Sequence, residues 1–97
     1  MKRKPAAEEL PGLQDLPTLD FSAFIFGIVG TAYTHLGDAP TPDGATEIDL
    51  PLARQDIDLL GLLEEKTQGN LTGDEERLLE QALYDLRMRY IEVARKS

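Results

Sequence analysis

The chain has 97 residues, with 18 Asp and Glu against 10 Lys and Arg, and its formal net charge is −8. It contains no Cys, which excludes a disulfide scaffold, a Cys-ligated zinc site, an iron–sulfur cluster and thiol catalysis. The length allows one domain. Because an acidic chain repels a phosphate backbone, we expect no nucleic-acid binding.

Residues 1–17 are expected to be a disordered leader. They contain three Pro, charges of both signs and scattered Leu, which is too little apolar surface to offset the entropy of ordering. The basic run Lys2–Lys4 is followed by proline and acidic residues, so it does not resemble a secretory signal. We therefore expect one cytoplasmic domain over residues 18–97.

The first expected helix covers about residues 20–36 and is very apolar, since residues 21–37 contain no Asp, Glu, Lys or Arg. Asp20 is placed to cap the free amides at its start, and Gly37 to adopt a left-handed conformation at its end. Large apolar side chains wrap around most of this helix, so we expect burial on more than one side. Six of these side chains are Phe21, Phe24, Ile25, Ile28, Val29 and Tyr33. Phe26, like Tyr33, lies off the main apolar stripe.

A polar connection over residues 37–48 and a second helix over about residues 50–67 are expected next. Asp49 is a suitable N-cap for this helix, and Pro51 falls in its first turn, where a missing amide costs nothing. Gly69 is expected to stop the helix.

The third expected helix covers residues 73–96. Thr72 and Glu75 have the spacing of a capping box, in which each side chain accepts a hydrogen bond from the other residue's amide. Apolar residues then follow a heptad seam, which predicts packing against the second helix as an antiparallel hairpin. The seam consists of Leu79, Leu83, Leu86, Tyr90 and Val93. The predicted fold class is all-α, with the first helix packed on this hairpin.

Several segments, taken in order, are similar to the bacterial domain-of-unknown-function family numbered 1844. They are Leu19-Asp-Phe-Ser-Ala-Phe24, Thr34-His-Leu-Gly37, Asp49-Leu50, Ile57-Asp-Leu-Leu-Gly-Leu-Leu-Glu-Glu-Lys-Thr-Gln-Gly-Asn-Leu-Thr72 and Leu83-Tyr-Asp-Leu-Arg-Met-Arg-Tyr90. The resemblance covers roughly residues 17–92. It implies a small all-helical cytoplasmic protein, and it implies no reaction, cofactor or catalytic residue.

His35, Asp38 and Asp43 are the residues that come nearest to a metal-binding set, because an imidazole with two carboxylates can bind a divalent ion. The favoured interpretation is that His35 interacts with the negative end of its own helix dipole or with Asp38. The remaining acids lack the Glu-x-x-His pairs of carboxylate metal sites. We therefore expect no enzyme activity, no metal and no cofactor.

An Arg–Tyr patch on the third helix is a second candidate. Asp85 and Arg89 are spaced to pair along the helix, while Arg87 lies beside the seam at Leu86 and Tyr90. Such a patch is common at interfaces, but internal bracing of the hairpin by Arg87 explains it equally well.

The first helix carries more apolar surface than one hairpin covers. Each large apolar side chain left exposed to water costs roughly 1.5–3 kcal/mol of folding free energy. We therefore predict a non-enzymatic, self-associating interaction or adaptor module, completed as a homodimer. Its candidate interface comprises the six large side chains of the first helix with Leu86, Arg87 and Tyr90. The sequence also leaves open an unidentified protein partner. The alternatives are a peripheral or inserted membrane anchor at residues 21–36 and a metal enzyme centred on His35.

Overall fold

The computed structural model describes residues 20–96, which form three helices, α1 (Phe21–His35), α2 (Leu50–Lys66) and α3 (Gly73–Lys96). The expected leader lies outside the described residues. Compared with the expected ranges, α1 is one residue shorter at each end, α2 ends one residue earlier, and α3 has the expected bounds.

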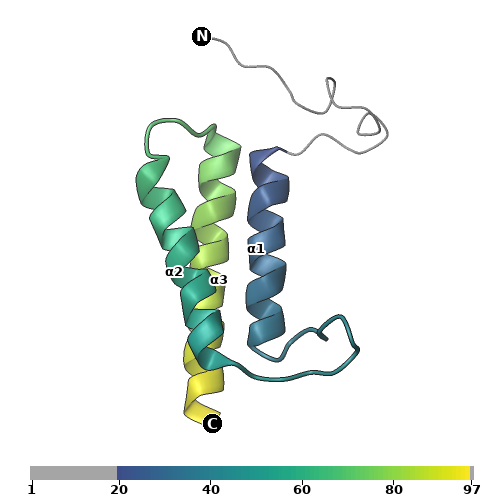
Figure 1. Cartoon of the computed structure of the whole chain (residues 1–97). Coiled ribbons are helices and arrows are strands. Elements are labelled where there is room, and N and C mark those ends of the chain that lie inside the picture. Colours follow the sequence, from purple (N-terminus) through teal and green to yellow (C-terminus); the bar gives the residue numbers. More distant parts are fainter. Residues whose placement is uncertain (1–19, 97) are drawn as a thin grey trace, which may run out of the picture.

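All three helices pack against one another, and the described residues contain no strand. Figure 1 shows α2 and α3 side by side, joined at one end by a short turn, with α1 lying along the pair. The long connection between α1 and α2 extends away from the helices at the other end of the molecule (Figure 1). The all-α class is therefore confirmed for the described part of the chain.

Side-chain caps explain where α1 and α2 begin. The Asp20 carboxylate accepts a hydrogen bond from the Ala23 amide at 2.8 Å, and the Asp49 carboxylate accepts one from the Leu52 amide at 3.1 Å. Pro51 occupies the first turn of α2, where no intrahelical partner is needed. A cap of this kind is worth about 1 kcal/mol.

The turn between α2 and α3 is determined by three residues. The Thr72 amide donates to the Glu75 carboxylate at 2.9 Å, and the Glu75 amide donates to the Thr72 hydroxyl at 3.1 Å, so that the two residues form a reciprocal capping box. Gly69 has a φ of 83°, in the left-handed region that favours glycine. These local signals reverse the chain within a few residues.

The core is apolar and receives side chains from every helix. It consists of Ile25, Ala32, Leu36, Ala53, Ile57, Leu60, Leu79, Leu83, Leu86 and Val93. Ile25 and Leu86 are 0% exposed within one chain, so the prediction that they belong to an intermolecular interface is wrong. Ile25 lies on the side of α1 that faces the other two helices, and Leu86 lies on the apolar seam of α3.

Backbone contacts hold the two ends of the connection between α1 and α2 next to each other. Leu36 and Ile48 form an isolated antiparallel bridge, and the Asp49 amide donates to the His35 carbonyl at 2.7 Å. Gly37, with a φ of 85°, lies against Ile48, and a Cβ there would come within 2.8 Å of the Ile48 side chain. These contacts hold the last turn of α1 beside the first turns of α2.

Candidate interaction surfaces

The outer face of α1 is the most unusual surface of the described chain. It comprises the exposed residues Ala23, Phe24, Phe26, Gly27, Gly30 and Thr31. Phe24 is 43% exposed and Phe26 is 60% exposed, although an exposed helix face normally carries charged residues. The whole of α1 lacks Asp, Glu, Lys and Arg. A solvent-facing surface of this composition is typical of an interaction site.

A groove of about 420 Å³ borders this face, between α1 and α2. Its lining consists of Ala23, Phe24, Gly27, Ile28, Thr31, Asp56 and Leu59. Gly27 leaves open space on the α1 side of the groove, since a Cβ there would meet nothing within 4 Å. Asp56 is the charged group of the groove, and its carboxylate is engaged by His35. The groove therefore presents a mostly apolar surface.

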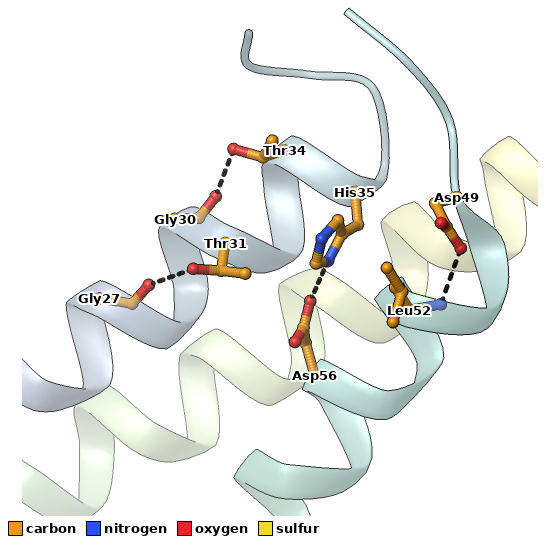
Figure 2. Close-up of polar contacts among 8 residues, drawn as sticks. All are labelled: Gly27, Gly30, Thr31, Thr34, His35, Asp49, Leu52 and Asp56. Carbon is orange, nitrogen blue, oxygen red and sulfur yellow. Dashed lines mark hydrogen bonds and ion pairs between the residues drawn. The ribbon is translucent and has the colours of Figure 1, made fainter. Parts of the chain in front are cut away.

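His35 and Asp56 link the end of α1 to α2. Figure 2 shows the imidazole directed toward the carboxylate, with 2.6 Å between Nδ1 and Oδ2. The side chains are 25% and 17% exposed, so solvent weakens this contact only in part. Of the two interactions expected for His35, the pair with Asp38 is wrong, because the imidazole is directed at Asp56 on α2. His35 does lie in the last turn of α1, where the other expected interaction, with the helix dipole, would act.

Neither threonine hydroxyl in the second half of α1 is directed at this imidazole. Thr31 donates its hydroxyl to the Gly27 carbonyl at 3.1 Å, and Thr34 donates to the Gly30 carbonyl at 3.0 Å (Figure 2). Both hydroxyls are thus bonded within α1. The described geometry at His35 supports a structural link between the two helices.

The residues considered for a metal site do not come together. Asp38 accepts two hydrogen bonds from Arg89, and Asp43 accepts hydrogen bonds from the Thr41 hydroxyl and the Ala45 amide. Among residues 20–96, no cluster of three or more His, Asp or Glu side chains is close enough to hold an ion. The set proposed from the sequence is therefore dispersed.

Arg89 connects α3 to the start of the connection after α1. Its guanidinium donates to both carboxylate oxygens of Asp38 at 2.8 Å and to Glu92 at 2.9 Å. The hydrogen bond from Arg89 lowers the pKa of Asp38. The predicted pair of Asp85 with Arg89 is wrong, because the Asp38 carboxylate satisfies the guanidinium fork with two bonds and Asp85 accepts from Gln81 instead.

The remaining predicted interface residues fall into two groups. Phe24 and Arg87 are exposed, whereas the others are half-buried and contribute to the packing of one chain. The half-buried residues are Phe21, Ile28, Val29, Tyr33 and Tyr90. Sequence reasoning missed Phe26, which is more exposed than Phe24. Its position off the main apolar stripe was the signal that it points outward.

None of the helices within residues 20–96 is long and apolar enough to cross a membrane. The 15 residues of α1 span about 22 Å, which is short of a hydrocarbon core of about 30 Å. The predicted alternative of a membrane-inserted anchor is therefore not supported.

These features define a small all-α domain with an uncharged helix on its surface. The chain belongs to the family described as Domain of unknown function (DUF1844), whose model matches residues 18–92. The match confirms the family that the ordered sequence segments resemble. No curated protein and no solved structure matches the chain.

Proposed function

We propose that this chain is a non-enzymatic, cytoplasmic interaction module that self-associates through the outer face of α1, with no cofactor and no nucleic-acid partner. The observation that carries the proposal is the exposure of Phe24 and Phe26 on a helix without any charged residue. The antiparallel pair of α2 and α3 supports α1 from one side in each copy, so that two copies complete a bundle.

Burial of this face supplies a useful driving force. A phenylalanine buries about 200 Å² when fully covered, so the exposed fractions of Phe24 and Phe26 correspond to about 200 Å² together. At roughly 25 cal/mol per Å², covering both rings contributes about 5 kcal/mol per copy. The apolar groove between α1 and α2 adds further surface, because it has room for side chains from a partner.

Charge favours the α1 face over the other outer surfaces as the place where two copies meet. The chain has a net charge of −8, so two copies repel each other wherever acidic side chains face one another. Both α2 and α3 carry Asp and Glu, whereas α1 carries none. Contact through α1 therefore allows two acidic chains to approach without placing like charges together, and two-fold dimers are the commonest assemblies.

The solution mass tests this proposal. Light scattering on the full chain, from low micromolar to near-millimolar protein without detergent, is expected to give twice the chain mass of 10.8 kDa. A mass of one chain over the whole range would overturn the proposal. So would aggregates that disperse only when lipid vesicles are added, because α1 would then bind lipid rather than a second copy.

A further inference from the structure

A second groove, of about 380 Å³, lies between α2 and α3. It is lined by Arg54, Ile57, Asp58, Arg87, Tyr90 and Ile91. The α2 residues of this groove differ from Asp56 and Leu59, which line the groove beside α1, so the two grooves lie on different sides of α2. Self-association through α1 therefore leaves this α2–α3 groove accessible.

The floor of the α2–α3 groove is apolar. Ile57 is 5% exposed and belongs to the core, Tyr90 is half-buried, and Ile91 is 45% exposed. A volume of about 380 Å³ is within the range of binding sites and has room for one or two large side chains. The groove therefore has space and apolar surface for a side chain that this chain does not itself supply.

The rim of the groove carries two guanidinium groups, which is unexpected in a chain of net charge −8. Arg54 lies 3.5 Å from the Asp58 carboxylate, and both side chains are nearly two-thirds exposed. Within residues 20–96, the side chain of Arg87 makes no hydrogen bond or ion pair. Arg77 and Arg89, on the same helix, both have carboxylate partners.

The Arg87 guanidinium reaches α2 beside Gly61. A Cβ at position 61 would lie 3.4 Å from Nη2 of Arg87, so the arginine extends across from α3 to the α2 side of the groove. Its planar fork thus lies beside the apolar floor, with its donors unused by residues 20–96. A guanidinium in that position is suited to a carboxylate, which it can bind through two parallel hydrogen bonds.

We propose that the α2–α3 groove binds an acidic amphipathic helix of another protein. A large aliphatic side chain of that helix packs on Ile57, Tyr90 and Ile91, and a neighbouring Glu or Asp carboxylate pairs with Arg87. An amphipathic helix supplies both the aliphatic side chain and the neighbouring carboxylate when its apolar stripe packs into a groove between two other helices. Local charge decides the class of partner. Although the chain is acidic overall, Asp58 at this groove is paired with Arg54, so Arg87, unpaired within the described residues, leaves a local excess of one positive charge that favours an acidic helix.

A fluorescein-labelled peptide tests the proposal on the full chain. The probe is a helical peptide with Leu at positions i, i+3, i+4 and i+7 and Glu beside each Leu, and its anisotropy is measured on titration. Two control peptides carry Lys in place of Glu, or Ala in place of Leu. We expect saturable binding of the first peptide and binding at least about tenfold weaker for both controls.

Matched arginine variants locate the site. Arg87→Gln is expected to weaken binding of the Leu/Glu peptide about tenfold or more, because it removes the charged fork and leaves the floor intact. Arg77→Gln is the control, since Arg77 lies on the same helix but pairs with Asp74 at 2.5 Å. Ile91→Gln, at an exposed position, is expected to weaken binding through the apolar floor.

Three results would overturn the proposal. One is the absence of saturable binding up to about 1 mM peptide, the weak end of the affinity scale. Another is equal binding by the Arg87→Gln variant and the unaltered chain. The third is a lower solution mass of Arg87→Gln in light scattering, which would assign the groove to a second copy of this chain. The proposal does not depend on dimerisation through α1, because the peptide can bind a single chain.

Discussion

Phe26→Ala is expected to abolish dimerisation while leaving the fold of each chain intact. The ring is 60% exposed, which corresponds to about 120 Å² of apolar surface for a phenylalanine of about 200 Å². At roughly 25 cal/mol per Å², its loss removes about 3 kcal/mol from association for each copy. Because a two-fold interface contains the residue twice, about 6 kcal/mol is lost in total, and the dissociation constant should rise by about 10,000-fold.

Light scattering over a dilution series, together with thermal unfolding at a concentration where the chain is monomeric, measures both effects. Tyr84→Ala is the matched control, since Tyr84 is 62% exposed on α3, outside the outer face of α1. We expect the control to retain the mass of the unaltered chain. If Phe26→Ala keeps the dimer, or if Tyr84→Ala loses it equally, the assignment of the interface to α1 is refuted.

Three further predictions concern the fold of one chain. Gly30→Ala should stabilise the monomer by about 1 kcal/mol, because no neighbour lies within 4 Å of its Cβ position, and a lower melting temperature of the monomer would contradict this. Asp38→Asn should destabilise the chain at pH 7. Since Arg89 lowers the folded pKa of Asp38 below the unfolded value of 3.8, the deficit should shrink as the pH falls through that range, and a constant deficit in urea unfolding would refute this. His35→Ala should cost about 1–3 kcal/mol in urea unfolding, through loss of the bond to Asp56, and an unchanged unfolding midpoint would show that this bond contributes nothing.

Local signals made the helices predictable from the sequence. Asp20, Asp49 and the Thr72–Glu75 pair act on amides three residues away, so spacing alone identifies them. The apolar periodicity of α3 likewise identifies its core side before any partner is known. These features do not depend on how the helices are arranged in space.

The polar contacts between elements were not predictable in this way. His35 pairs with a residue 21 positions away and Arg89 with one 51 positions away, whereas the sequence favoured the nearby acids Asp38 and Asp85. A long-range partner is decided by helix packing and by the path of the connection. The same limitation applies to Ile25, since an apolar side chain on a nearly all-apolar helix can face either the core or solvent.

The bridge between Leu36 and Ile48 closes the intervening segment into a loop, which contacts the helices near its start through the pair of Asp38 with Arg89. Because both ends are fixed, a change of length between them alters neither the contact of α1 with α2 nor the direction of either helix. The exposed stretch from Pro42 to Gly44 is therefore a place where a short epitope or fluorescent label can be inserted. For the same reason, we expect this segment to tolerate changes of length and sequence without a change in the packing of the helices.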